Sequence, residues 1–158
     1  MAGFAKIGVA AAALGLALAF GTVAVVAQDK EAEIKTRRDT MKRQGKDFKA
    51  IQDYVKGVGD QAAAEAAIAD LQSIAPKIVT LFPEGTGLDA FPGKTGAKPA
   101  IWKEWDKFKQ IPVALQGYEV KLAAAIKSGD KAAVGAALVN TGKNGCGACH
   151  SDYREKVS

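Results

Sequence analysis

Apolar residues recur at intervals of three and four along most of the chain, and this spacing constrains the fold more than any other feature. Between residues 29 and 58 two heptad series run three positions apart, one of them through Ile34, Met41, Phe48 and Val55. Such a double series forms one stripe on a helix that faces a bundle. The sequence shows neither the alternation typical of strands nor an internal repeat. It therefore predicts an all-α fold.

Turn-forming residues divide this pattern into four helices. The predicted helices cover residues 29–58, 60–81, 100–127 and 131–156, and residues 82–99, rich in proline and glycine, form a long loop. Asp60 and Asp130 suit N-caps, whereas Pro76 and Pro112 are expected to bend their helices. Around residues 142–145 the last helix is expected to loosen. Four amphipathic helices in this order predict an antiparallel up-down four-helix bundle.

The N-terminal segment has a different character. Residues 1–27 contain one charge, Lys6, followed by an apolar run that ends in small residues, which is typical of a secretory signal peptide. Cleavage is predicted between Ala27 and Gln28. The run is also long enough to span a bilayer as an uncleaved anchor, but no positively charged stop follows it. We expect an exported, periplasmic protein in which residues 28–158 form one domain.

One pentapeptide, Cys146 to His150, contains both cysteines and the only histidine of the chain. C-x-x-C-H is the pattern of covalent haem attachment. Two thiols separated by two residues form thioethers with the haem vinyl groups, and the next residue then places an imidazole nitrogen beneath the iron. The sequence therefore predicts one haem c, held by Cys146 and Cys149 and ligated by His150.

Three other interpretations of this pentapeptide compete. A C-x-x-C pair can be a thiol-disulfide redox centre, but such a centre normally opens a helix in a βαβ fold, and no such pattern is present. A zinc site needs four ligands, and two cysteines with one histidine leave the fourth unnamed. The motif also occurs by chance. The export signal and the helical pattern favour haem over all three.

The charge of the chain excludes one class of partner. The net charge is +5, and loss of Lys6 with the signal peptide lowers it to +4. This surplus is spread along the chain rather than gathered in the basic stripe of a nucleic-acid binder. We expect no nucleic-acid partner, and a preference for an acidic periplasmic redox protein.

The chain resembles the class II cytochromes c, the family of cytochrome c-prime. The segment 146–154 matches the family ending C-x-x-C-H-x-x-Tyr-Arg, and segments 81–86 and 95–102 match its central region. In the first helix, Arg37 and Met41 match an arginine followed four residues later by the residue that covers the distal face of the haem. The resemblance implies a four-helix bundle with one covalent haem c against the first and fourth helices.

The resemblance also assigns residues around the haem. It implies thioethers at Cys146 and Cys149, an axial ligand at His150, a propionate-pairing Arg37, and a basic Arg154 beside the proximal face. The residues themselves agree on two points. Arg37 is a charge on an apolar stripe and needs a partner, and Arg154 lies four residues after His150, which on a helix is the same face.

The family pattern is not matched everywhere. Arg38 stands where Gln or Glu is common, and Gly96 stands where Glu often follows Thr95. Arg38 and Thr95 remain candidates for polar contacts to the haem.

The resemblance implies two possible states of the iron. In one branch the distal residue is an apolar cover, the iron is five-coordinate, and NO or CO binds. In the other, the methionine sulfur is the sixth ligand and the protein is a low-spin electron carrier, which here makes Met41 a possible iron ligand. Electron transfer is common to both, and a homodimer is implied by the relatives. An enzyme is not expected, because no acid–base group can be placed over the iron.

Overall fold

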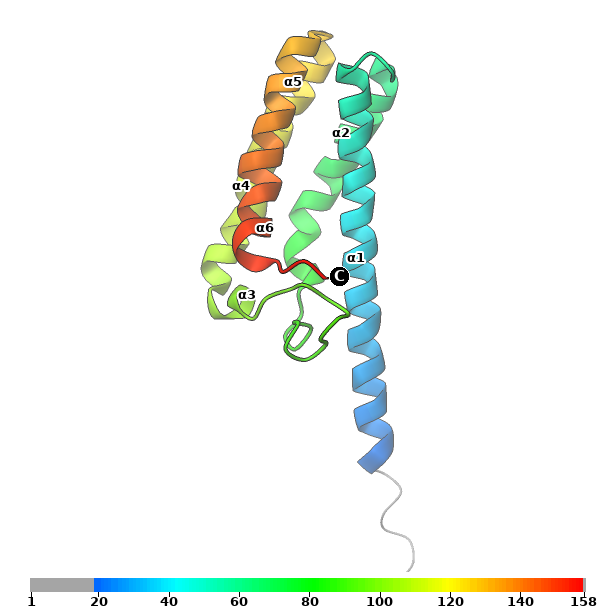
Figure 1. The fold of residues 1–158 in the computed structure, drawn as a ribbon, viewed down its shortest axis with the longest axis vertical. Coiled ribbons are helices and arrows are strands. Elements are labelled where there is room, and N and C mark those ends of the chain that lie inside the picture. Colours follow the sequence, from blue (N-terminus) through cyan, green and yellow to red (C-terminus); the bar gives the residue numbers. More distant parts are fainter. Residues whose placement is uncertain (1–18, 158) are drawn as a thin grey trace, which may run out of the picture.

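The computed structural model describes residues 19–157, and the regular elements of this range are helical. They are α1 (Ala19–Val55), α2 (Gln61–Ile74), the 3-10 helix η1 (Ala75–Leu81), α3 (Ala100–Lys103), α4 (Trp105–Ser128), α5 (Lys131–Asn140), the π-helix η2 (Thr141–Cys146) and α6 (Gly147–Tyr153). The helix α1 packs against α2 and α5, and α4 packs against the same two. Neighbouring helices run in opposite directions (Figure 1). The predicted all-α, up-down bundle is confirmed.

The start of the chain differs from the prediction in one respect. The helix α1 begins at Ala19 rather than at Asp29, and it extends beyond the bundle at its N-terminal end (Figure 1). Residues 1–18 of the predicted signal peptide lie outside the described residues. Within the described range, no helix is both long enough and apolar enough to cross a membrane.

The helix ends follow the turn chemistry. Oδ1 of Asp60 accepts a hydrogen bond of 2.7 Å from the backbone N–H of Ala63, and Asp130 caps α5 in the same way. The predicted extension of the first helix to residue 58 is wrong. The helix α1 stops at Val55, Gly57 adopts a left-handed φ of 79°, and Val58 is 76% exposed.

Two predicted helices are divided. The α-helical part of the second ends at Ile74, next to Pro76, and the chain continues as the 3-10 helix η1. The third breaks at Glu104, whose backbone (φ −114°, ψ 37°) separates α3 from α4. Pro112 lies inside α4 as predicted.

The apolar core consists of two clusters. One fills the end of the bundle far from the loop: Ile51, Tyr54, Ala64, Ala67, Ile68, Leu71, Leu122, Ile126, Val134 and Leu138. The other fills the loop end: Ile74, Ala75, Ile78, Phe82, Ala97, Ile101, Phe108, Leu115 and Tyr153. A cavity lined by Leu71 of the first cluster and by Ile78 and Leu115 of the second lies where they meet.

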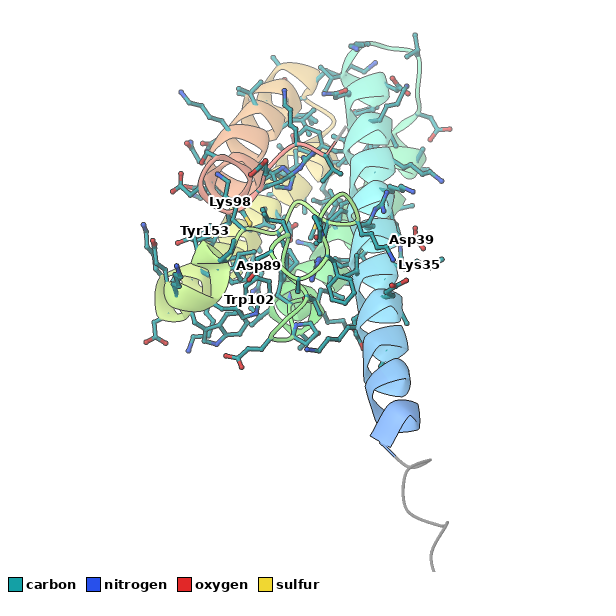
Figure 2. All side chains as sticks on the ribbon, turned by 60° about the horizontal axis from the view of Figure 1, so that its bottom comes forward. Lys35, Asp39, Asp89, Lys98, Trp102 and Tyr153 are labelled. Carbon is teal, nitrogen blue, oxygen red and sulfur yellow. The ribbon has the colours of Figure 1, made fainter. Side chains whose placement is uncertain are left out.

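The C-terminal tail pairs with the loop instead of extending the last helix. The predicted helix to residue 156 is wrong beyond Tyr153, because Arg154 is extended and forms an antiparallel bridge with Ala97. The N–H of Glu155 donates to the carbonyl of Gly96 at 2.8 Å. A Cβ at position 96 would overlap the carbonyl oxygen of Glu155, so the paired tail leaves room only for glycine at this position. Figure 2 shows Lys98 beside Tyr153, whose carbonyl accepts from the Lys98 N–H.

Candidate functional site

The π-helix η2 positions the pentapeptide. It is the form taken by the loosening predicted at residues 142–145, and single π-turns inside α-helices are frequent at functional sites. Gly145 brings η2 against α4, since a Cβ there would lie 2.6 Å from Cδ1 of Leu115. Gly142 brings η2 against α1 in the same way, because a Cβ added there would lie 2.9 Å from Cζ of Phe48. Without side chains at these two positions, the cysteines that follow reach the interior of the bundle.

Two adjoining cavities lie between α1 and the C-terminal helices. Their volumes are about 490 and 420 Å³, and both are lined by Met41, Gly45, Cys149 and His150. The larger is also lined by Arg37, Arg38, Thr95 and Arg154, and the smaller by Cys146. The structure therefore brings every predicted site residue to one connected space, of the size that cofactor sites occupy.

The two thiols are unsuited to redox exchange. Burial raises the pKa of Cys149 to about 11 and also raises the pKa of Cys146. Thiol-disulfide centres need the opposite, because the thiolate is the reactive form. Among residues 29–157 no group of His, Cys, Asp and Glu is arranged to hold a metal ion. The thiol-redox and zinc interpretations thus gain no support.

His150 is suited to serve as an iron ligand. Its side chain is exposed toward the cavities that it lines. Burial among the surrounding protein atoms lowers its pKa, and the charge of Arg154 lowers it further. The neutral imidazole, which is the form that binds metals, is therefore favoured.

Arg37 is held by the loop. Its side chain is 4% exposed, and its two Nη atoms donate to the carbonyls of Leu81 and Thr86 and to the hydroxyls of Thr86 and Thr95, at 2.7–3.0 Å. The guanidinium also lies 4.8 Å from the ring centre of Phe82. Burial lowers its pKa to about 10, although Glu33 acts in the opposite direction.

All four acceptors of Arg37 are neutral, so they solvate the cation without compensating its charge. A carboxylate in the larger cavity would compensate it, which agrees with the predicted pairing to a haem propionate. Sequence reasoning missed the loop contacts of Thr86 and Leu81.

The larger cavity has a basic lining. Besides Arg37 it is lined by Arg38, Lys42, Lys94 and Arg154, against one carboxylate, Glu155. Arg38 donates from Nη1 to the carbonyl of Lys94 at 3.1 Å, which joins α1 to the loop a second time. Arg154 reaches this lining from the extended tail and not from the helical face that sequence spacing predicted. The cationic lining of the larger cavity suits the propionate edge of a haem. The mostly apolar lining of the smaller cavity, which includes Cys146, suits the vinyl edge.

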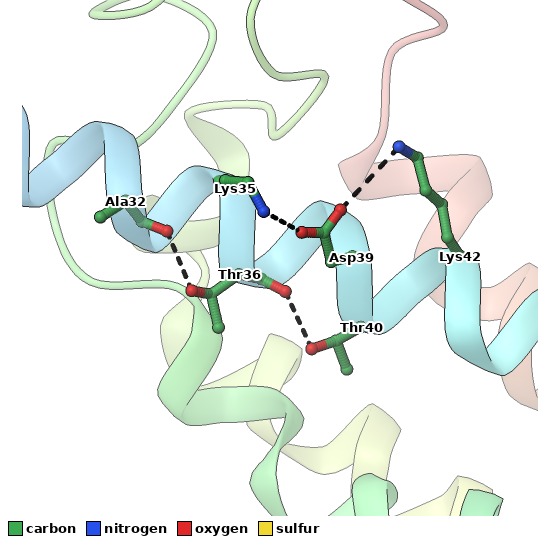
Figure 3. A network of polar contacts seen from close by, with 6 residues as sticks. All are labelled: Ala32, Lys35, Thr36, Asp39, Thr40 and Lys42. Atoms are coloured by element: carbon green, nitrogen blue, oxygen red, sulfur yellow. Dashed lines mark hydrogen bonds and ion pairs between the residues drawn. The ribbon is translucent and has the colours of Figure 1, made fainter.

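The outer face of α1 carries polar contacts within the helix itself. Lys35 pairs with Asp39 at 2.6 Å, and Thr36 and Thr40 each donate to the carbonyl one turn earlier, as Figure 3 shows. The partner lysines lower the pKa of Asp39, but these groups are exposed and such pairs contribute little stability.

Two buried residues that line the cavities were not assigned a place in the site from the sequence. Tyr153 is 2% exposed, its ring packs edge-to-face on Phe108 at 5.3 Å, and its hydroxyl donates to Glu104 at 3.0 Å. Glu119 is 1% exposed and lines the smaller cavity. A signal for Glu119 was present, because it falls between Leu115 and Leu122 on the inward stripe of α4, as Arg37 falls on the stripe of α1.

Comparison with known proteins agrees with this geometry. The family model described as Cytochrome C' matches residues 32–154. Cytochrome c' of Rhodospirillum rubrum is 38% identical over 144 residues, which cover 87% of this chain and 93% of that protein. Cytochrome c-556 of Agrobacterium tumefaciens is 34% identical over 128 residues, covering 78% and 98%.

Solved structures show the same fold. Cytochrome c' from Thermochromatium tepidum superposes with a TM-score of 0.72 at 26% identity, over 80% of this chain and 97% of that one. Cytochrome c' from Alcaligenes xylosoxidans gives 0.68 at 30% identity with the same coverage. With two thiols, one imidazole and a cationic lining gathered in one space, and relatives of this similarity, the chain belongs to the cytochrome c' family.

Proposed function

We propose that the chain is an exported, periplasmic electron carrier that holds one haem c and binds NO or CO at the distal side of the iron. One observation carries this proposal. Both thiols and the only imidazole of the chain converge, with Met41 of α1, on two adjoining cavities whose loop end is cationic. Signal-peptide cleavage between Ala27 and Gln28 is part of the proposal.

Haem iron supplies reversible one-electron chemistry and, when its sixth position is open, a site for a small ligand. Cys146 of η2 and Cys149 of α6 would hold the group, and His150 would present a neutral nitrogen to it. Arg37, Arg38, Thr95 and Arg154 would receive its carboxylates at the loop end. These residues fix and orient the cofactor, and no acid–base group is assigned a chemical step, in accord with a carrier rather than an enzyme.

Gas binding is supported by the relatives and by Met41. A structure of a cytochrome c' variant from Alcaligenes xylosoxidans is described as a nitrosyl complex. In this chain Met41 lines both cavities from α1, and we assign it the role of an apolar cover on the distal side.

Homodimer formation belongs to the same proposal. A related cytochrome c' is described as having a ligand-controlled dimer dissociation. Sedimentation of the haem-loaded protein with and without CO tests whether this chain forms such a dimer.

Covalent attachment is the first test. Protein purified from the periplasm and denatured should have the mass of the chain from Gln28 plus one haem, and the colour should resist acid–acetone extraction. The Cys146→Ala/Cys149→Ala double variant should lose the colour, whereas Lys103→Ala, an exposed change on α3, should keep it. Extractable haem in the wild type would contradict the proposal.

Spectra of the ferric and ferrous protein test the distal side. If Met41 is a cover, both oxidation states should be high-spin, CO should bind the ferrous form, and Met41→Ala should speed CO entry more than Met41→Leu does. If Met41 is the sixth ligand, the wild type should be low-spin and closed to CO, because sulfur occupies the gas site. A low-spin wild type would contradict gas binding and leave electron transfer intact.

A further inference from the structure

A buried carboxyl group that the proposed function does not use lines the smaller cavity. Glu119 lies on α4 with 1% of its surface exposed, and its Oε2 has no hydrogen-bond partner among the described residues. The same cavity is lined by Gln44, whose Nε2 is likewise buried without a partner in this part of the chain. Buried polar atoms normally have partners, and exceptions call for an explanation.

The surroundings of Glu119 contain few charges. The titratable side chains that share its cavity are Lys49 from α1 and Cys146, Cys149 and His150 from η2 and α6. The helices α2 and η1 contribute only Leu71 and Ile78 to the lining, and α5 contributes no residue. Thioether formation would remove both thiols as titrating groups. Ligation to the haem iron would likewise prevent His150 from titrating. Glu119 would then be the carboxyl group that shares the smaller cavity with the two thioether positions.

From this geometry we infer that Glu119 is a redox-linked proton site, which makes electron transfer by this protein proton-coupled. Glu119 takes up one proton from solvent when one electron arrives from the donor protein, and it releases that proton when the electron leaves to the acceptor. The inference rests on the proposed function, because it needs the haem in the two cavities.

The physical reason is the low dielectric of the site. An added electron makes the cavity more negative, and a carboxylate nearby is then disfavoured relative to the neutral acid. The coupling is reciprocal: the factor by which reduction raises the proton affinity of Glu119 is the factor by which protonation favours reduction.

Two further observations make the exchange feasible near neutral pH. Burial alone raises the pKa of Glu119 to about 7, so both protonation states are accessible there. The cavity is also lined by the exposed Lys49, so it lies next to solvent.

The test is the reduction potential of the haem-loaded protein as a function of pH. In the wild type the potential should fall with rising pH around neutrality, with a slope approaching one proton per electron, about 59 mV for each tenfold change in proton concentration. Glu119→Gln keeps the shape of the side chain and should flatten the curve in this range.

Asp47→Asn is the matched control. Asp47 also has a raised pKa, about 6, because of burial and the neighbouring Asp70, but it lines neither cavity. This variant should keep the wild-type slope. A redox-difference infrared spectrum gives a second measurement: the wild type should gain a protonated-carboxyl band on reduction, and Glu119→Gln should lack it.

The outcomes separate the inference from the proposed function. A flat wild-type curve, or a Glu119→Gln curve that keeps the slope, would overturn the inference and assign any proton coupling to another group, such as a propionate. A protein that carries no covalent haem would instead overturn the proposed function.

Discussion

Arg37 joins the first helix to the long loop through its guanidinium. The four hydrogen bonds end at three residues of the segment from Leu81 to Thr95, so a single side chain holds this segment against α1. Hydrogen bonds to a charged group are stronger than neutral ones, and their loss leaves buried acceptors unsatisfied. Arg37 therefore has a structural role that is independent of any propionate.

Arg37→Leu should lower the free energy of unfolding by about 2–4 kcal/mol, because it leaves buried carbonyl and hydroxyl groups without a donor. Lys46→Leu, at an exposed position of α1 that lines neither cavity, should change it by about 0.5 kcal/mol or less. Denaturant unfolding of both haem-loaded variants gives the comparison. The reduction potential should also shift in Arg37→Leu if a propionate lies beside it. Equal, small effects of the two substitutions would mean that the loop does not depend on Arg37.

Glu119 makes stability depend on pH in a direction opposite to that of most acids. Its pKa is about 7 in the fold and near 4.3 in an unfolded chain, so between these values the native state binds more protons. The stability that the neutral Glu119 side chain contributes is fully present below the pKa of this group in the unfolded chain. It is lost as the pH rises toward 7. The gain in unfolding free energy from Glu119→Gln should therefore grow from pH 4 to pH 7 and then level off. A gain that does not vary with pH would contradict this.

At the scale of single elements, the π-helix η2 decides which way the last helix points. It depends on glycines at the closest approaches to α1 and α4. An added methyl group at such a contact forces side chains or backbone to shift.

Gly145→Ala should lower the free energy of unfolding by about 1–3 kcal/mol and reduce the fraction of chains that carry haem, because its Cβ meets Leu115. Gly117→Ala is the matched control on α4, where a Cβ meets nothing within 4 Å. It should be neutral or stabilise by about 0.5–1 kcal/mol, since alanine favours the helix. Thermal unfolding and intact mass of both proteins give the two quantities. The prediction fails if the two variants behave alike.

At the scale of the whole molecule, the sequence was sufficient for the helical bundle and the attachment motif, but not for the bounds of each helix. Their signals are local: heptad spacing, Asp60 and Asp130 as caps, and two cysteines beside the only histidine. The contacts between distant segments were not predictable in this way. The end of the last helix at Tyr153 depends on pairing between the tail and Ala97, and the neutral partners of Arg37 come from a loop about fifty residues away.

The two-part core makes a prediction for the protein without its cofactor. Of the buried residues of the far cluster only Leu71 lines a cavity, whereas the loop-end cluster borders both cavities. In the Cys146→Ala/Cys149→Ala variant, amide hydrogens around Ile51 and Leu122 should stay protected from exchange, while those around Ile101 and Tyr153 should lose protection. Hydrogen exchange followed by mass spectrometry measures this. Uniform loss over the whole chain would show that the bundle folds only as one unit.

The bridge between Ala97 and Arg154 has a consequence for biogenesis. Arg154, Glu155 and Val157 line the larger cavity, so the paired tail borders the space in which the haem would lie. We therefore expect haem attachment to precede the pairing of the tail with Ala97. Because thioether bonds do not reverse, a mature molecule has no route for exchanging a damaged haem. Renewal of the cofactor then requires synthesis of a new polypeptide.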